Sequence, residues 1–162
     1  MDLYLIRHAD AKPLGEDGIQ DDADRPLTSK GDAQARALAH TLQKRGVQLG
    51  LVVSSPLLRA RQTAEKMLAH WADPVPALTT SDEVAPGGKR RKLSKFLREQ
   101  SVDAIAVVGH IPGIVAYAAW LIGDKKAELD LAKAGIARIV CPDGPRKGEG
   151  KLTWLVTPEW FE

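Results

Sequence analysis

The stretch DLYLIRHA, residues 2–9, joins a short apolar run to two basic side chains. Residues Asp2–Ile6 show no alternation of polar and apolar side chains, which is typical of a strand buried on both faces of a parallel sheet. Arg7 and His8 follow this run directly. The stretch therefore predicts a central strand that ends in two side chains capable of chemistry.

The same arrangement occurs twice more along the chain. Leu49–Val53 and Ala104–Val108 are also apolar runs that predict buried strands, and they precede Ser54-Ser55 and Gly109-His110. Ligands of open α/β sheets bind beyond the carboxyl ends of the strands. Polar residues from three strand ends, with Arg7-His8 at the first, are therefore expected to meet at one edge of the sheet.

Helical patterns separate the predicted strands. Helices are predicted from Thr28 to Arg45, Ser55 to His70, Lys89 to Gln100 and Ile111 to Leu121. Loops are predicted at Ala9–Pro26 and Asp73–Gly88. Two last strands are predicted at Gly135–Cys141 and Lys151–Thr157, joined by a turn region at Pro142–Gly150. This order predicts an α/β fold, a three-layer α/β/α sandwich with a mostly parallel central sheet, as a single domain over residues 1–162.

Capping residues support two of the predicted helix boundaries. Thr28 or Ser29 can cap the first helix, and Gly46 is placed to end it. In the second helix, Ser55 is the predicted N-cap and Pro56 the predicted first helical residue.

Composition excludes several classes of protein. With 162 residues, of which 44% are hydrophobic and 27% charged, the chain matches a globular domain and not a disordered, collagen-like or coiled-coil protein. Cys141 has no second cysteine for an internal disulfide, which fits a reducing compartment. The apolar stretch Ile111–Ile122 is too short for a membrane span, and the N-terminus lacks a signal-peptide pattern. These features together predict a cytoplasmic protein without a membrane partner. The net charge of +2 implies no strong attraction to nucleic acid, so no nucleic-acid partner is expected.

Five basic side chains are expected near the predicted sheet edge, and they suggest an anion site. Arg7, His8 and His110 follow strands, Arg25 closes the first long loop, and Arg59 lies in the first turn after Ser55. A single histidine at a strand end is usually only a polar loop residue. Several cations placed together need an anion, and the planar fork of arginine matches phosphate oxygens.

Leu5-Ile6-Arg7-His8-Ala9 resembles the signature of the histidine phosphatase superfamily, whose members have the phosphoglycerate-mutase-like fold. Further segments match family motifs in the same order: Arg25-Pro26-Leu27-Thr28 with Gly31, Ser54 to Ala60 with Gln62-Thr63, and Gly109-His110 with Pro112. The matches extend from Leu5 to Pro112, and each lies where the pattern predicts a loop or strand end.

Two runs of the sequence also resemble one subgroup of this superfamily. The runs Arg7–Ala11 and Asp24–Thr28 are similar to bacterial phosphohistidine phosphatases of the SixA type, and the chain lacks the large insertions of glycolytic mutases. Ala9 replaces the usual glycine of the family. If that glycine has a positive φ, Ala9 is strained, and otherwise the replacement is neutral.

The resemblance implies a mechanism without metal or cofactor. His8 would be the nucleophile and carry the phosphoryl group, while Arg7, Arg25, Arg59 and His110 would bind its oxygens. The implied substrate is phosphohistidine on a signalling protein. The residue that protonates the leaving group is open: Glu83, in the proline-rich loop, is one possibility, its neighbour Asp82 a rival, and a solvated loop carboxylate is the alternative.

Other interpretations remain at this point. One is a phosphatase of the same superfamily that acts on small phosphomonoesters or nucleotides, and another is a catalytically weak module that binds phosphoproteins. The set Arg7, His8, Arg59 and His110 argues against a binding module, which needs no nucleophile. The basic run from Lys89 to Arg98 is interpreted as a solvated helix face, with docking of an acidic phosphoprotein as the alternative.

Overall fold

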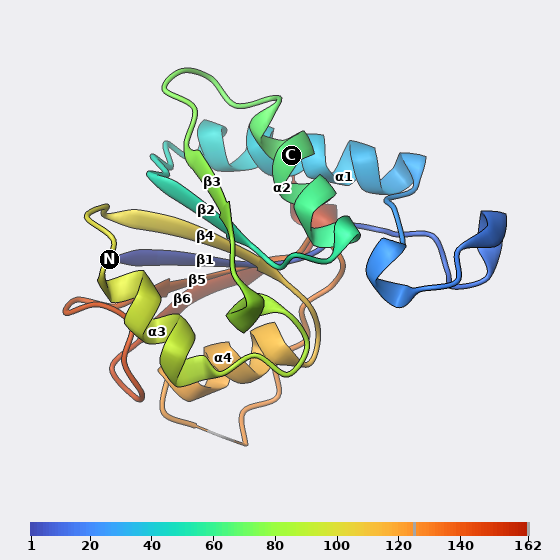
Figure 1. The fold of residues 1–162 in the computed structure, drawn as a ribbon. Coiled ribbons are helices and arrows are strands. Elements are labelled where there is room, and N and C mark those ends of the chain that lie inside the picture. The colour runs from blue at the N-terminus through green and yellow to red at the C-terminus, as the bar shows by residue number, and fades with distance from the viewer. Residues whose placement is uncertain (125, 162) are drawn as a thin grey trace.

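A computed structural model of the chain describes residues 1–124 and 126–161 and contains a six-stranded sheet covered by helices (Figure 1). The strands are β1 (Asp2–Arg7), β2 (Leu51–Ser54), β3 (Ala77–Thr80), β4 (Ala104–Gly109), β5 (Ile136–Val140) and β6 (Lys151–Val156), in the order β3-β2-β4-β1-β5-β6. Strands β1 to β4 run parallel, whereas β5 and β6 are antiparallel to their neighbours. The prediction of a mostly parallel sheet is confirmed.

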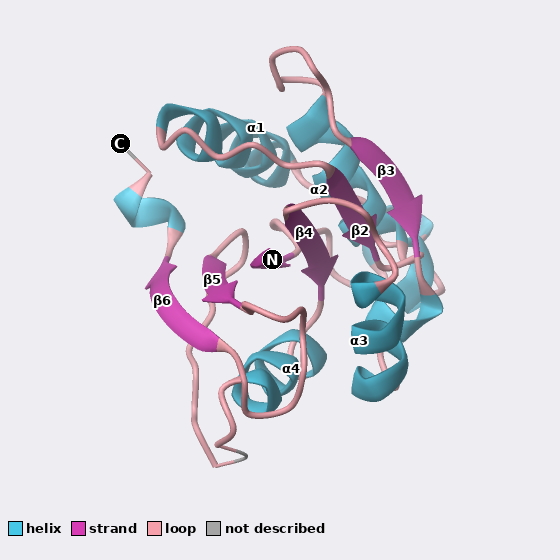
Figure 2. Ribbon diagram, turned by 90° about the vertical axis from the view of Figure 1, so that its left-hand side faces the viewer, coloured by secondary structure: helices cyan, strands magenta, loops and turns pink. Residues whose placement is uncertain are grey.

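Helices lie on both faces of this sheet. One face carries α1 (Ser29–Lys44) and α2 (Leu58–Leu68), and the other carries α3 (Arg90–Arg98) and α4 (Gly113–Leu121) (Figure 2). Alternate residues of β1 enter the two cores: Leu3 and Leu5 pack with α3 and α4, while Tyr4 and Ile6 pack with α1 and α2. Burial on both faces is why the strand reads as a continuous apolar run.

The predicted boundaries of the first helix are confirmed. The Thr28 hydroxyl accepts the Gly31 N–H at 3.1 Å, so Thr28 is the N-cap of α1. Beyond the helix end, Gly46 has φ of 72°, a left-handed conformation that glycine adopts without strain. None of the helices in the described parts of the chain is long and apolar enough to cross a membrane.

The segment Asp73–Gly88 is not only a loop, because it contains β3. This strand has four residues, pairs with β2 on one side, and is largely exposed, with Leu78 38% accessible. An exposed edge strand between prolines has neither the apolar run nor the alternation that identifies strands in a sequence. The loop Ala9–Pro26 likewise contains two short 3-10 turns, at Glu16–Gly18 and Asp22–Asp24.

The predicted start of the second helix is wrong. Helix α2 begins at Leu58, and Leu57 is its N-cap without a side-chain hydrogen bond. The Ser55 N–H donates to the Val108 carbonyl at 2.9 Å, so the backbone at Ser55 is still bonded to β4 and cannot yet turn. Helices α3 and α4 are also shorter than predicted, and α4 begins after Pro112.

The sheet brings the predicted site segments together. Strands β2, β4 and β1 are consecutive and parallel, so their carboxyl ends share one edge. The His8 N–H donates to the Gly109 carbonyl at 2.9 Å, which continues the pairing one residue beyond β1. His8, Ser55 and His110 are therefore held beside one another by backbone hydrogen bonds.

Candidate active site

The imidazole of His8 is fixed in one tautomer. Its Nδ1 lies 2.8 Å from the Ala9 carbonyl oxygen, which can only accept, so Nδ1 carries the proton. The other nitrogen, Nε2, therefore has a lone pair, and it accepts the Arg59 Nε–H at 3.3 Å. His8 is 8% exposed. It thus presents a nucleophilic nitrogen from a nearly buried ring.

His8 is uncharged at neutral pH. Burial lowers the pKa of His8 to about 4. The positive charges of Arg59, Arg7 and Arg25 act in the same direction, and the hydrogen bond to Ala9 opposes the shift. A neutral imidazole is the form that attacks phosphorus. Ala9 itself is outside the left-handed region of backbone conformation, so its replacement of glycine causes no backbone strain.

Arg59 connects His8 to two other segments. It lies in the first turn of α2, and its side chain is 6% exposed. Besides the bond to His8, its Nη1 donates to the Asp22 carbonyl at 2.6 Å and its Nη2 to the Asp22 carboxylate at 2.9 Å. One turn later, Thr63 accepts the Ala9 N–H at 3.0 Å and donates to the Arg59 carbonyl at 2.6 Å. Thr63 therefore ties the His8 segment to α2.

Arg7 has a donor that no described protein group uses. Its Nη1 donates to the Leu131 carbonyl at 3.1 Å, which holds the side chain against the segment before β5. Its Nε is buried and finds no acceptor among the residues that the structure describes. Since a buried guanidinium N–H needs an acceptor, Arg7 fits a site for an anionic ligand oxygen.

His110 faces His8 and is also uncharged. The centres of the two rings are 5.1 Å apart. Burial lowers the pKa of His110 to about 3. Repulsion from His8 in its protonated form and from Arg59 contributes to this shift, and the charge of Asp22 opposes it. Its Nε2 lies 2.8 Å from the Ser55 hydroxyl, which also accepts the Leu57 N–H. If Ser55 donates to Nε2, the His110 proton is on Nδ1, which is buried without a partner in the described chain.

Arg25 reaches the site through Asp22. Its Nη1 donates to the Asp22 carboxylate at 2.9 Å, and its Nε donates to the Lys12 carbonyl at 2.6 Å. The same carboxylate thus bridges Arg25 and Arg59. The structure brings together all five predicted side chains of the basic cluster: Arg7, His8, Arg25, Arg59 and His110.

Glu83 is not in hydrogen-bond contact with this cluster. One of its carboxylate oxygens accepts the Lys89 N–H at 2.6 Å, and the other lies 3.6 Å from the Lys92 ammonium group. Glu83 therefore binds the residue that directly precedes α3. Asp10, two residues after His8, accepts hydrogen bonds from Thr28 and Lys133.

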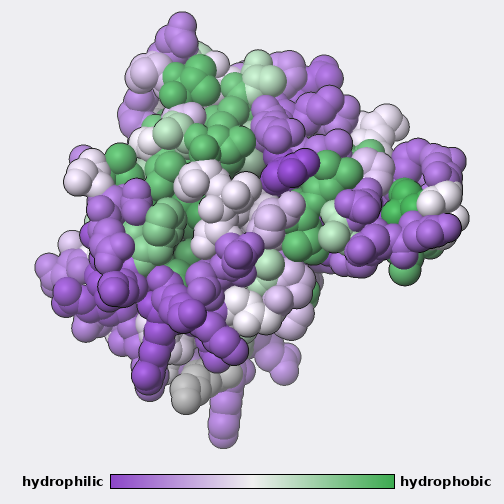
Figure 3. All heavy atoms as spheres, viewed as in Figure 1, coloured by the Kyte–Doolittle hydropathy of each residue, from purple (hydrophilic) through white to green (hydrophobic). Residues whose placement is uncertain are grey.

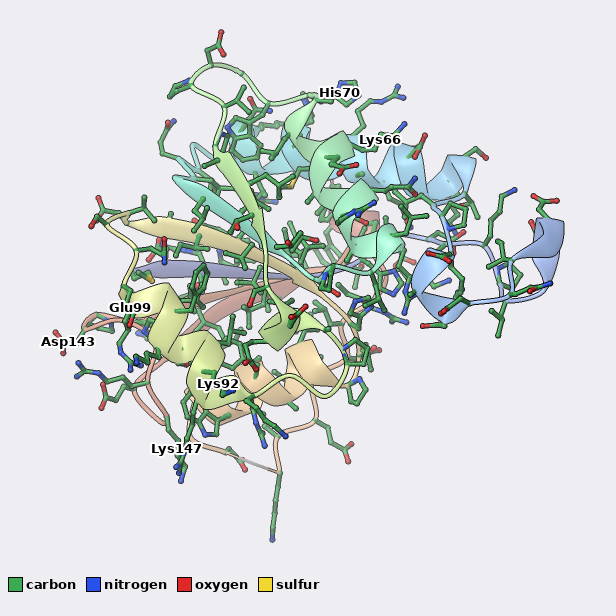
Figure 4. The ribbon with its side chains drawn as sticks, viewed as in Figure 1. Lys66, His70, Lys92, Glu99, Asp143 and Lys147 are labelled. Atoms are coloured by element: carbon green, nitrogen blue, oxygen red, sulfur yellow. The ribbon has the colours of Figure 1, made fainter. Side chains whose placement is uncertain are left out.

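The two remaining histidines and a wide hollow lie outside the cluster. His40 and His70 are exposed, and Figure 4 shows His70 at the outer end of α2. A hollow of about 260 Å³ next to His110 is lined by residues 84–88, Arg90 and residues 111–113, so it can receive the part of a substrate beyond the reacting group. A larger one of about 740 Å³ is lined by Asp2, Arg45 and Trp154 and contains none of the cluster.

Sequence patterns alone do not assign three residues of the site. Ser55 has the pattern of a helix cap, Thr63 lies within a family motif without an evident role, and Asp22 is one of several aspartates in a polar loop. Each acts through a partner distant in sequence, so local patterns give little indication of it. Within residues 1–124 and 126–161, no group of histidine, cysteine or acidic side chains is arranged to hold a metal ion.

Acidification from pH 7 to 5 is expected to lower the free energy of unfolding through His8 and His110. Histidine in the unfolded chain titrates near 6.5, so only the unfolded chain takes up these protons in this range. The free energy of unfolding therefore has its full value above pH 6.5 and falls toward pH 4. The loss is up to about 1.4 kcal/mol per pH unit for each histidine. Urea unfolding at pH 7 and 5 measures this loss.

A matched pair of variants tests this assignment. His110→Asn should reduce the pH dependence of unfolding, whereas His40→Asn, at an exposed position on α1, should leave it unchanged. An equal pH dependence in wild type and His110→Asn would contradict a buried, neutral His110.

Comparisons with known proteins show which family this chain is similar to. Residues 3–100 match the model of the histidine phosphatase superfamily (branch 1). An uncharacterized protein of Picosynechococcus sp. is 35% identical, with 99% of each chain covered. Phosphohistidine phosphatase SixA of Escherichia coli is 28% identical over 98% of this chain and 94% of the relative. A structure of the protein histidine phosphatase SixA complexed with tungstate has a TM-score of 0.84 and 26% identity, covering both chains completely.

Proposed function

Because the chain belongs to the histidine phosphatase superfamily, which supports phosphatase activity, we propose that it hydrolyses phosphohistidine on a protein through a phosphoryl group carried by His8. The observation that carries this proposal is the state of His8. The Ala9 carbonyl holds its Nδ1 proton, and its Nε2 lone pair accepts a hydrogen bond from Arg59, while the charges of Arg7 and Arg25 also act on the ring. The full length of this chain resembles phosphohistidine phosphatase SixA, which supports the choice of substrate.

In the first step, His8 Nε2 attacks phosphorus, and the bond from phosphorus to the substrate nitrogen breaks. Arg7, Arg25 and Arg59 bind the phosphoryl oxygens, and His110 donates a hydrogen bond to one of them. Phosphoryl transfer has a loose transition state, so positioning and charge stabilisation supply most of the catalysis. The arginines provide the positive charge, and the proposed reaction uses no metal or cofactor.

In the second step, water attacks phosphorus and the bond to His8 Nε2 breaks. Throughout, Nδ1 of His8 keeps its proton, and this N–H donates a hydrogen bond to the Ala9 carbonyl. The phosphorylated ring is therefore an imidazolium, and it leaves as a neutral imidazole that needs no further proton. Water supplies the fourth oxygen of inorganic phosphate, and its proton passes to solvent. The hydrogen bond to Ala9 thus makes His8 both a nucleophile and a good leaving group.

The chemistry of the leaving group favours phosphohistidine over alkyl phosphates. A substrate imidazole leaves readily once its other nitrogen is protonated, whereas an alkoxide needs an acid. Glu83, the acid suggested by the sequence, is bound to the Lys89 N–H and lies beside Lys92. We propose that phosphohistidine hydrolysis does not depend on Glu83.

Glu83→Gln is accordingly expected to change kcat/KM for a phosphohistidine protein by less than about threefold, because no alkoxide has to be protonated. Glutamine retains an oxygen that can accept the Lys89 N–H, so the contact before α3 is kept. Phosphate release measures the effect. A loss of tenfold or more on phosphohistidine would identify Glu83 as a required acid.

The substrate assignment is tested with a panel of a phosphohistidine protein, phosphoserine, phosphotyrosine, a sugar phosphate and a nucleoside triphosphate. Release from phosphohistidine alone supports the proposal. Equal turnover of phosphohistidine and phosphoserine contradicts it and favours a phosphatase of small molecules. Helix α3 further supports a protein substrate. Its side chains are mostly basic, and hydrophilic side chains dominate this part of the surface (Figure 3). Its first residue, Arg90, lines the hollow beside His110.

A further inference from the structure

The carboxylate of Asp22 occupies the arginines that the proposed mechanism assigns to phosphate. Its two oxygens accept from different residues, Oδ1 from Arg25 Nη1 and Oδ2 from Arg59 Nη2, each at 2.9 Å. A carboxylate and a phosphoryl group offer arginine similar pairs of oxygens. The hydrogen bond from Arg25, together with that from Arg59 and the two positive charges, lowers the pKa of Asp22, so the carboxylate is ionised at neutral pH.

Every nitrogen of the Arg59 guanidinium donates a hydrogen bond in this arrangement. Its Nε donates to the His8 lone pair, and its Nη1 and Nη2 both donate to Asp22. In-line attack on phosphorus needs the His8 lone pair free, and binding of a phosphoryl group needs Arg59 donors. Substrate must therefore replace the bonds that Arg59 makes to His8 and to the Asp22 carboxylate.

We propose that Asp22 is an internal competitor of the phosphoryl group, which sets the affinity of the site for substrate and promotes release of inorganic phosphate. This inference rests on the phosphate site of the proposed function, but not on the identity of the phosphorylated substrate. Asp22 would leave Arg25 and Arg59 when a phosphoryl group arrives and return to them as the product departs.

The position of Asp22 suits such an exchange. Its side chain is 54% exposed, whereas that of Arg59 is 6% exposed, so the carboxylate can move into solvent while the guanidinium stays. Asp22 begins a short 3-10 turn in which no residue is buried. The carboxylate carries one negative charge, so its replacement by a doubly charged phosphoryl ligand is favourable.

Asp22→Asn is expected to tighten binding of inorganic phosphate about three- to tenfold, because it removes the competing charge and its repulsion of the ligand. The inhibition constant of phosphate as product should fall by a similar factor, and KM should fall without a rise in kcat. Isothermal titration with phosphate and with tungstate measures affinity in the full-length protein without any substrate.

Two variants serve as controls. Asp24→Asn makes the same charge change two residues away, at an exposed side chain that forms no ion pair with the described arginines, and should bind phosphate like wild type. Asp22→Glu keeps the competing charge and should not tighten phosphate binding. Tighter phosphate binding by Asp22→Asn alone supports the proposal that Asp22 competes with the phosphoryl group.

Unchanged or weaker phosphate binding by Asp22→Asn overturns the inference, as does equal tightening by Asp24→Asn, which would reflect net charge alone. Absence of anion binding in all variants and wild type overturns the phosphate site itself. If Asp22→Asn tightens binding but the protein does not release phosphate from phosphohistidine, the competitor stands and the proposed substrate is wrong.

Discussion

Replacement of His8 by alanine is expected to reduce phosphate release by at least about a thousandfold, since it removes the atom that bonds to phosphorus. The neighbouring imidazole of His110 cannot replace it, because its Nε2 lies 2.8 Å from the Ser55 hydroxyl and is engaged there. The measurement is kcat/KM for a phosphohistidine protein, compared between wild type and variant.

The control for this prediction is His40→Ala, at an exposed position on α1, which should retain full activity. Circular dichroism and phosphate binding show whether His8→Ala is still folded. A folded variant with more than a tenth of wild-type activity would exclude His8 as the nucleophile.

Arg59→Met is expected to reduce kcat/KM about a hundred- to thousandfold, equivalent to about 3–4 kcal/mol of transition-state stabilisation. Methionine fills part of the same buried space but donates no hydrogen bond to the phosphoryl oxygens. Arg59→Lys should recover only part of the loss, since an ammonium group has no planar fork. Steady-state kinetics on the phosphohistidine protein measure both variants.

Arg61→Met is the matched control for Arg59→Met. Arg61 belongs to the same helix but is exposed, so its loss should change kcat/KM by less than about twofold. Thermal unfolding of both variants separates lost catalysis from lost stability. Activity within tenfold of wild type in folded Arg59→Met would contradict a direct role of Arg59 in phosphate binding.

The central sheet and most of the site can be predicted from the sequence because their signals are local. In β1 and β4, side chains of both faces are buried, so the apolar runs appear directly in the sequence. The rule that ligands bind beyond strand ends then points to His8 and His110. The expected positions of Arg7 and Arg59 follow from the same reasoning.

The rest depends on contacts between distant residues. Ser55 followed by Pro56 has the pattern of a helix start, but the Val108 carbonyl holds its backbone and His110 engages its hydroxyl. Asp22 lies in a polar loop with four other aspartates, and only folding places it on Arg25 and Arg59. The edge strand β3 is exposed and short, so it resembles a loop in sequence.

The proposed reaction depends most directly on a phosphoryl group bonded to Nε2 of His8. Wild-type protein should be mixed with a phosphohistidine protein, quenched within milliseconds under alkaline conditions that preserve phosphohistidine, digested and examined by mass spectrometry. We expect a phosphoryl group on the peptide that contains His8, which forms and decays at rates compatible with turnover and is absent from His8→Ala. Turnover at a normal rate with no phosphorylated His8 at any time, or with the label on another residue, would contradict this mechanism.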